Sequence, residues 1–339
     1  MTETAPQRKA LDLSQEFFEK VALPSMQEAF PGDWIRMGIG LVGNGSECFG
    51  FDDELSCDHD WGTEFLVWLT EEDYERIGDD VRAWKARLWE EHADDSAYPF
   101  REISDYGVTT TVMTPGMFYS MLIGFPHGPQ TVMEWRRPPE ANLALCVNGR
   151  VFADPVGEFS RTRDYLQGYY PEDLRRKKIA ARCMSLAQTG QYNYLRIAQR
   201  GDTVAKHITL GKFVQDAISM AFMLNKRFMP YYKWAFRAMT ELPLLASDVA
   251  PLLELLYADD LETREVLGSI DAGNVIVRPV AEVDFKRAIV IERICALFAD
   301  ELRRQGLSSS TATFLARHGE EVQRTIGDPV LSKLPPQFE

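Results

Sequence analysis

The sequence predicts an α+β fold in which a small mixed α/β domain precedes an all-helical domain. The chain has 339 residues, which at roughly 150 residues per domain suggests two domains. Up to about residue 155, short apolar runs are mixed with Gly, Asp and Pro, whereas long stretches of helical period dominate from about residue 160. We therefore predict an α/β domain over residues 1–155 and a helical bundle over residues 156–339, with a short link around residues 155–170.

The N-terminal half is expected to begin with a helix over residues 11–30. Ser14 is its expected N-cap, and Pro24 should kink or split it. Residues 71–92 carry apolar side chains spaced by three or four, as in an amphipathic helix. Strand character is found at three places, of which the last is rich in β-branched residues: residues 35–42, 59–69 and 108–113. This half is thus a mixed α/β unit.

The C-terminal half contains six stretches with the period of a helix. Pro171 suits a helix start, because its missing N–H group is not needed there, and Gly306 suits a helix end. Four methionines at positions 220, 223, 229 and 239 are expected to pack in the core. The predicted helices cover residues 171–188, 202–225, 230–240, 247–257, 281–305 and 318–326.

Composition excludes several classes of protein. The net charge of −14 argues against a long nucleic-acid partner, which would require a broad basic face. No apolar stretch is long enough for a membrane helix, and the first residues lack the apolar core of a secretory signal, so we expect a cytoplasmic protein.

No CxxC pair occurs among the cysteines, so a disulfide framework or structural zinc is not expected. We expect small core residues, with one reactive thiol as the alternative, at Cys48, Cys57, Cys146, Cys183 and Cys295.

Two short elements point to chemistry. Gly45-Ser46 follows a predicted strand, and glycine lets backbone N–H groups approach phosphate oxygens closely. Asp58 and Asp60 open the next predicted strand, where residues i and i+2 share a face about 7 Å apart, while His59 points to the other face. Such carboxylates suit Mg²⁺. The alternative for the two aspartates is a turn or a solvated strand edge.

Together these elements resemble the GS…DxD signature of the DNA polymerase β-like nucleotidyltransferase superfamily. In that superfamily the Gly-Ser turn holds the triphosphate and the two aspartates hold the metals. The stretch from Gly45 to Gly62 is similar to a bacterial family of this superfamily that is known only as a domain of unknown function. The general layout of the chain, a small α/β domain followed by a helical domain, is similar to that of aminoglycoside nucleotidyltransferases. Four later segments agree with this resemblance: residues 149–154, 170–173, 230–234 and 314–318.

The resemblance implies Mg²⁺-dependent transfer of a nucleotidyl group from an NTP, with ATP expected, to a hydroxyl of a small molecule or protein. Pyrophosphate would be released. Members usually carry a third carboxylate on a later strand, but residues 108–113 contain no acid. Three alternatives remain open. Glu102, Asp105 or Glu134 supplies the third carboxylate, a general base comes from another part of the chain, or catalytic activity is reduced or lost. The alternative function is therefore a non-catalytic nucleotide-binding or interaction protein that retains the fold.

The helical half offers further candidates. Lys226 and Lys233 would reach the triphosphate as point charges, or are solvated surface residues. A polar cluster that includes Gln191, Asn193 and Arg196 forms either an acceptor pocket or a hydrogen-bonded helix junction. Asn193 and Arg196, at i and i+3, share a helix face, whereas Gln191 and Arg196 are about 140° apart. The first two are therefore the predicted acceptor contacts.

Overall fold

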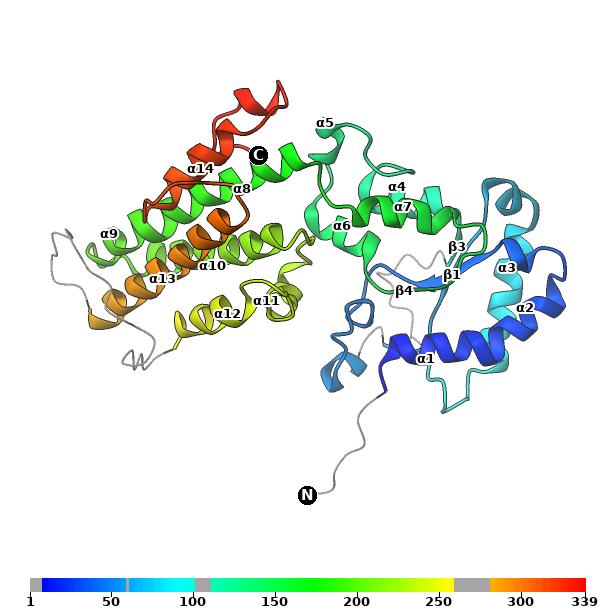
Figure 1. Cartoon of the computed structure of the whole chain (residues 1–339). Helices are drawn as coiled ribbons and strands as arrows, with labels where there is room; N and C mark the ends of the chain where they lie inside the picture. The colour runs from blue at the N-terminus through cyan, green and yellow to red at the C-terminus, as the bar shows by residue number, and fades with distance from the viewer. Residues whose placement is uncertain (1–7, 59–60, 101–110, 259–280) are drawn as a thin grey trace, which may run out of the picture. The chain divides into compact units, whose positions relative to one another are not determined.

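The computed structural model describes residues 8–58, 61–100, 111–258 and 281–339, apart from the side chains of residues 57 and 58 (Figure 1). Contacts within the chain divide it into two compact units, Met1–Tyr169 and Tyr170–Glu339. The residues expected to form a link instead contain helix α7 (Glu158–Gln167), and residue 155 falls inside unit 1. Phe159 of α7 stacks on Trp68 of the sheet with ring centroids 3.6 Å apart, which holds this helix in unit 1.

Unit 1 contains a mixed four-stranded sheet with the order β3-β2-β1-β4. Strand β1 pairs antiparallel with β2 and β4, whereas β2 and β3 are parallel. Strands β2, β3 and β4 therefore all run opposite to β1. β4 was not expected from the sequence. β1 is shorter than predicted because Trp34–Arg36 forms a 3-10 helix, and β2 begins only at Leu66. The strands are β1 (Gly38–Leu41), β2 (Leu66–Trp68), β3 (Val112–Met113) and β4 (Arg150–Ala153).

Helices cover both faces of this sheet. Because side chains alternate along a strand, Val67 joins the core with α1–α3, while Trp68 meets rings of α4 and α7. α1 (Ala10–Phe17) continues through a π-helical turn, Phe18–Ala22, into α2 (Leu23–Ala29), so the break predicted at Pro24 lies just before it. The remaining helices are α3 (Glu71–Glu91), α4 (Pro115–Ile123), α5 (Val132–Trp135) and α6 (Glu140–Val147).

The prediction that Ser14 caps the first helix is wrong. The helix begins one turn earlier, at Ala10, and Ser14 is buried within it. Its hydroxyl donates to the Ala10 carbonyl (2.7 Å) and accepts from the Glu64 N–H (3.1 Å). Ser14 therefore ties α1 to the segment that leads into β2.

A buried ion pair fixes the same segment from the other side. The Lys85 ammonium on α3 donates to the Glu64 carboxylate at 2.6 Å, and both side chains are at most 10% exposed. The ammonium also lies 4.6 Å from the centroid of the Trp89 ring. Burial lowers the pKa of Lys85, and the neighbouring carboxylate opposes this shift. Glu64 is thus held by a partner that is itself removed from water.

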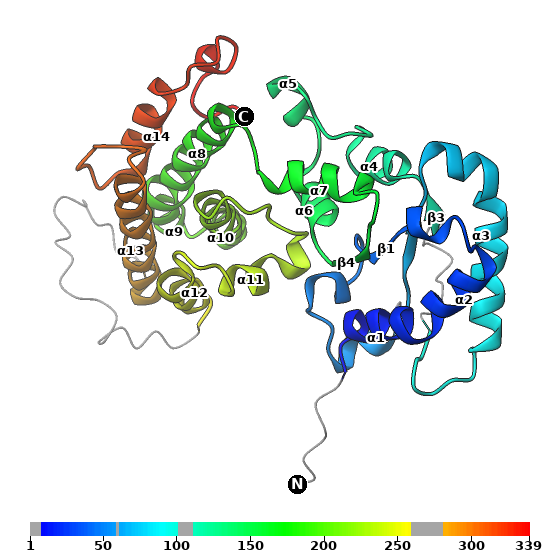
Figure 2. The same ribbon diagram turned by 45° about the vertical axis from the view of Figure 1, so that its right-hand side comes forward.

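Unit 2 is a bundle of helices, in agreement with the predicted fold class. α10 lies inside the unit, with α8, α13 and α11–α12 around it (Figure 2). A loop at Gly306, where φ is 67°, follows the end of α13. The helices are α8 (Glu172–Leu186), which continues into a π-helical segment (Ala187–Tyr194) and α9 (Leu195–Ala198), then α10 (Thr203–Leu224), α11 (Tyr232–Thr240), α12 (Ala246–Leu255), α13 (Glu282–Arg304) and α14 (Leu315–Arg324).

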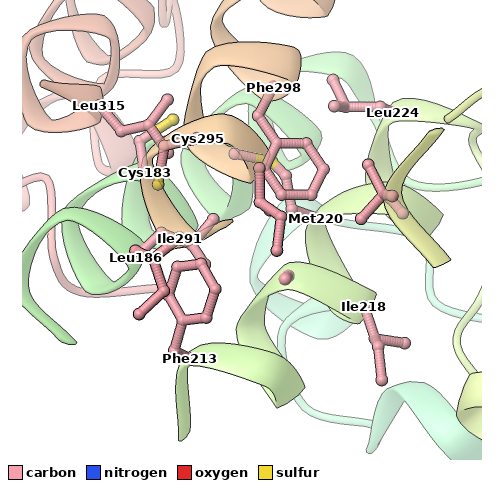
Figure 3. Close-up of a cluster of buried hydrophobic side chains, with 14 of the residues drawn as sticks. Cys183, Leu186, Phe213, Ile218, Met220, Leu224, Ile291, Cys295, Phe298 and Leu315 are labelled. Carbon is pink, nitrogen blue, oxygen red and sulfur yellow. The ribbon is translucent and has the colours of Figure 1, made fainter. Parts of the chain in front are cut away.

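The core of unit 2 contains the four methionines that were expected to pack there, with Met229 only partly buried, and two of the five cysteines. Met220, Met223 and Met239 are fully buried. Cys183 and Cys295 lie in the same apolar cluster as Met220 and Phe298 (Figure 3). Burial raises the pKa of both thiols, so they are inert packing groups, like the buried Cys48 and Cys146 of unit 1. Among the helices that the structure describes, none is long and apolar enough to cross a membrane.

Replacing Lys85 with Met should lower the free energy of unfolding by about 3–5 kcal/mol, because the Glu64 carboxylate would stay buried without its partner. Urea denaturation followed by circular dichroism measures this loss. The double variant Glu64→Gln/Lys85→Met should be more stable than Lys85→Met alone. Arg87→Met, on the exposed side of α3, should change stability by less than about 0.5 kcal/mol. A Lys85→Met variant as stable as the wild type would show that the Lys85–Glu64 ion pair does not stabilise this segment.

Candidate functional site

The chain leaves β1 through a glycine-rich turn, Gly43–Ser46, and enters a short 3-10 helix, Glu47–Phe49. Gly43 and Gly45 have φ values of +115° and +121°, which side chains other than hydrogen rarely allow. The Ser46 carbonyl accepts the N–H groups of Phe49 and Phe51, which closes the turn. No other described residue engages the Ser46 hydroxyl or the N–H groups of Gly45 and Ser46. The turn therefore presents free donors.

Asn148 holds this turn to the start of β4. Its side-chain oxygen accepts the Gly43 N–H at 2.8 Å, and its amide nitrogen donates to the Gly43 carbonyl, also at 2.8 Å. Next to it, the Gly149 N–H donates to the Cys48 carbonyl at 2.7 Å. The two turns are thus joined by three hydrogen bonds that involve backbone groups, which fixes the shape of the glycine turn.

Arg163 on α7 supports the Asn148–Gly149 turn from behind. Its guanidinium donates to the Asn148 carbonyl at 2.7 Å and to the Gly149 carbonyl at 3.3 Å. Burial lowers the pKa of Arg163, but arginine stays protonated because its ordinary pKa is so high. The sequence reasoning missed both Asn148 and Arg163. The Asn-Gly pair just before β4 is a turn signal, whereas nothing in the sequence pattern singles out Arg163.

Glu47 is a further residue that the sequence reasoning missed. It directly follows Ser46, and its side chain is almost completely buried. A Cβ atom placed on Gly45 would lie only 2.0 Å from a Glu47 carboxylate oxygen. The carboxylate therefore folds back over the turn, and Gly45 is required both by its φ and by this contact.

The two predicted metal ligands follow the turn. Asp58 is the last residue of a 3-10 helix, Glu54–Asp58, and β2 begins only at Leu66. The argument that Asp58 and Asp60 share one face of a strand is therefore wrong for Asp58. Asp60 and His59 lie outside the described residues. Within the described side chains, to which those of Asp58 and Asp60 do not belong, no group of three or more His, Cys, Asp or Glu residues is arranged to hold a metal ion.

Of the three candidates for a third carboxylate, the structure describes only Glu134. Glu102 and Asp105 lie outside the described residues. Glu134 belongs to α5, where it accepts the Gln130 N–H at 2.7 Å and forms a capping box with Thr131. The Glu134 carboxylate therefore accepts backbone N–H groups at the start of α5. Residues 111–114, which the structure describes around β3, contain no acid.

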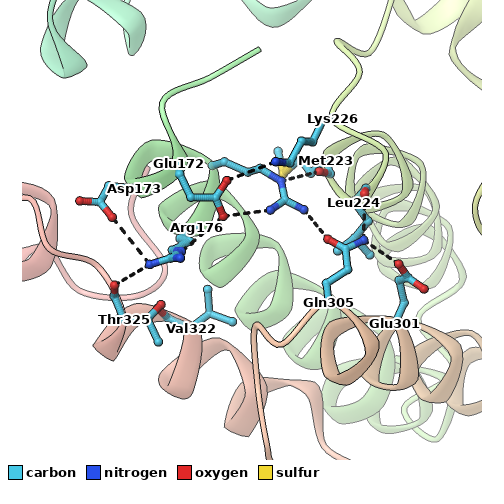
Figure 4. Close-up of polar contacts among 11 residues, drawn as sticks. Glu172, Asp173, Arg176, Met223, Leu224, Lys226, Glu301, Gln305, Val322 and Thr325 are labelled. Atoms are coloured by element: carbon cyan, nitrogen blue, oxygen red, sulfur yellow. Dashed lines mark hydrogen bonds and ion pairs between the residues drawn. The ribbon is translucent and has the colours of Figure 1, made fainter. Parts of the chain in front are cut away.

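The two lysines proposed for the triphosphate lie in unit 2. The ammonium of Lys226 is 3.7 Å from the Glu172 carboxylate, which also accepts from Arg175 at 3.1 Å (Figure 4). Lys226 has a φ of +51°, and 60% of its side chain is exposed. The ammonium of Lys233 lies 5.0 Å from the centroid of the Trp234 ring. Lys226 is thus part of an ion-pair network, and Lys233 is held against an aromatic surface.

The residues of the polar cluster in unit 2 differ in their hydrogen bonds. Gln191 donates to Glu292 at 2.7 Å and to the Thr313 carbonyl at 2.9 Å, and it accepts the Leu315 N–H at 2.9 Å. Burial raises the pKa of Glu292, and the hydrogen bond from Gln191 opposes this rise. Gln191 therefore belongs to a hydrogen-bonded helix junction, which was one of the two interpretations of this cluster.

Asn193 and Arg196 differ from Gln191. Arg196 is exposed, but its guanidinium donates to the Tyr192 hydroxyl at 2.7 Å and lies 3.9 Å from the centroid of the Tyr192 ring. Asn193 is half-buried in the π-helical segment, and its side chain has no hydrogen-bond partner among the described residues. The Asn193 side chain is therefore open to another molecule, whereas Arg196 is held against Tyr192.

Asn148→Ala should lower the free energy of unfolding by about 2 kcal/mol, because it removes both bonds to Gly43 and leaves a buried N–H group without a partner. Urea denaturation checks this value. The matched control is Asn44→Ala, since Asn44 is exposed in the same turn and its side chain makes no hydrogen bond to the described residues. Equal stability of the two variants would mean that the Asn148 bonds do not hold the turn.

Gly45→Ala should destabilise the protein by about 1–3 kcal/mol through backbone strain, and further through collision with Glu47. Glu47→Ala introduced in the same chain should remove the collision, so the two changes should couple by at least about 0.5 kcal/mol. Thermal and urea denaturation of both single variants and of the double variant measure this coupling. Strictly additive losses would show that the carboxylate does not cover Gly45.

Comparison with known proteins gives one match. A family model described as "Domain of unknown function (DUF4037)" matches residues 135–235. This region begins at Trp135, includes Asn148 and Arg163, and ends in α11. No curated protein and no solved structure matches the chain. The chain is thus similar over this region to a family whose description assigns no activity.

Proposed function

We propose that this protein is a Mg²⁺-dependent nucleotidyltransferase. It would transfer a nucleotidyl group from an NTP, with ATP as the expected donor, to a hydroxyl of a small molecule or protein and release pyrophosphate. The observation that carries the proposal is the fixed Gly43–Ser46 turn with its free N–H groups, followed by two aspartates that lie 12 and 14 residues after Ser46.

The turn is suited to hold phosphates. The N–H groups of Gly45 and Ser46 and the Ser46 hydroxyl would donate to oxygens of the β- and γ-phosphates. Because Asn148 and Arg163 already fix the turn, little conformational entropy would be lost when a nucleotide binds. Lys226 and Lys233 are the proposed additional cations, and Lys226 would first have to leave Glu172.

Asp58 and Asp60 would supply two carboxylates, the kind of ligand that Mg²⁺ prefers. When bound, the ion would offset the negative charge of the phosphates. Asn193 and Arg196 remain the proposed acceptor contacts. The Asn193 side chain, which has no partner among the described residues, supports that role, and the exposed Arg196 guanidinium would turn from Tyr192 towards the acceptor. Gln191 is excluded from it by its three hydrogen bonds at the helix junction.

A second candidate function is binding of a nucleotide or a partner without catalysis. Two observations favour it: residues 111–114 contain no acid, and the Glu134 carboxylate is engaged in its capping box. Both candidates predict nucleotide binding, so binding alone does not separate them. Release of pyrophosphate from a panel of NTPs with hydroxyl-bearing acceptors does.

Asp58→Asn and Asp60→Asn should each abolish Mg²⁺-dependent binding of ATP, measured by isothermal titration calorimetry, and leave the melting temperature close to that of the wild type. Ser46→Ala should weaken binding about fivefold, because one hydrogen bond worth about 1 kcal/mol is lost. Glu54→Gln serves as the control, since Glu54 is exposed in the same short helix as Asp58. If both asparagine variants bind Mg-ATP as tightly as the wild type, the aspartates are not the metal ligands.

A further inference from the structure

Unit 1 contains a pocket of about 790 Å³ that is separate from the glycine turn. This volume lies within the range of small-molecule sites, about 300–1,000 Å³. Its polar lining includes Glu71, Glu158, Arg161 and His127, and its apolar lining includes Met117 and Pro126. The lining therefore combines both signs of charge with an apolar surface.

The topology of the sheet places this pocket at the edge opposite to the glycine turn. Gly38, at the start of β1, pairs with Trp68 at the end of β2, and Ile39 pairs with Ala153 at the end of β4. Strands β2, β3 and β4 thus end where β1 begins, and each leads into the helix whose first turns line the pocket: α3, α4 and α7. In open sheets, ligands commonly bind beyond the carboxyl ends of strands. The Gly43–Ser46 turn lies beyond the other edge.

The charged groups of the pocket are available to a ligand. Glu71, Glu158, Arg161 and His127 form no hydrogen bond or ion pair through their side chains with any other described residue. Glu71 and Glu158 are the first residues of α3 and α7. Both acidic side chains therefore start helices that border the pocket.

Other groups of the lining are engaged and hold the wall in place. The Tyr165 hydroxyl donates to the Pro129 carbonyl at 2.5 Å, and Gln130 donates to the carbonyls of His127 and Gly128 at 3.1 and 3.0 Å. The Tyr119 hydroxyl donates to the Phe159 carbonyl at 3.0 Å, which fastens α4 to α7. The pocket is thus preformed.

The geometry points to a second ligand site in this pocket, which takes a basic amino acid. Two carboxylates and one guanidinium complement a molecule that carries two cationic groups and one carboxylate. Glu71 and Glu158 would bind the cationic groups, and Arg161 would bind the carboxylate. The methylene groups of such a ligand would pack on Met117 and Pro126. The site does not depend on the proposed nucleotidyl transfer.

The probe is L-lysine, titrated into the full chain by isothermal titration calorimetry. L-norleucine lacks the side-chain ammonium, and cadaverine lacks the carboxylate. Both should bind at least about tenfold more weakly than L-lysine, because each leaves one charged group of the pocket without a partner. Absence of L-lysine binding, or equal binding of L-lysine and L-norleucine, would overturn the assignment.

Variants locate the site and separate it from the nucleotide site. Glu158→Gln and Arg161→Gln should each weaken L-lysine binding about tenfold without changing the affinity for Mg-ATP. Glu72→Gln is the matched control, because Glu72 is exposed beside Glu71 in the same helical turn but does not line the pocket. Its affinity for L-lysine should equal that of the wild type. Equal losses in Glu72→Gln and Glu158→Gln would place the bound L-lysine elsewhere.

Discussion

Two hydrogen bonds between the Asn148 side chain and the backbone of Gly43 join parts of the chain that are 105 residues apart. A single bond of this kind contributes only about 1 kcal/mol, but a buried N–H group left without a partner costs more than that. Arg163 extends the connection from the Asn148–Gly149 turn to α7. A glycine-rich turn has many conformations available when it is free, so its fixed shape depends on this connection. The proposed phosphate site depends on it as well.

The direction of β1 separates the two proposed ligand sites of unit 1. Because β1 runs opposite to the other three strands, the turn that follows it lies at one edge of the sheet, and the starts of α3, α4 and α7 lie at the other. The glycine turn offers donors to an anion, whereas the pocket at the opposite edge offers two carboxylates and a guanidinium. The two proposed ligand sites of unit 1 therefore differ in charge and lie at opposite edges of the sheet.

The sequence predicted the fold class and most helices of unit 2, because apolar residues repeat there with the helical period over long stretches. It missed α7, since this helix is short and polar and its place depends on tertiary contacts such as that of Phe159 with Trp68. Ser14 has the residue type of a cap but serves a tertiary contact to Glu64. Local patterns found Gly45 and Ser46. Asn148 shows only the turn signal of its Asn-Gly pair and Arg163 shows no signal, because the roles of both residues arise from contacts between segments that are distant in sequence.

The most direct test of the account follows the backbone amides of the ¹⁵N-labelled protein by NMR while Mg-ATP is added. The account predicts that the largest shifts occur at Gly43, Gly45 and Ser46, whose N–H groups lie in the fixed turn, and that Gly116 in the opposite pocket changes little. The same titration in Asn148→Ala should give smaller shifts at these residues. Unchanged amides throughout Gly43–Ser46 at saturating Mg-ATP, or shifts confined to the opposite pocket, would contradict the claim that this turn holds the phosphates.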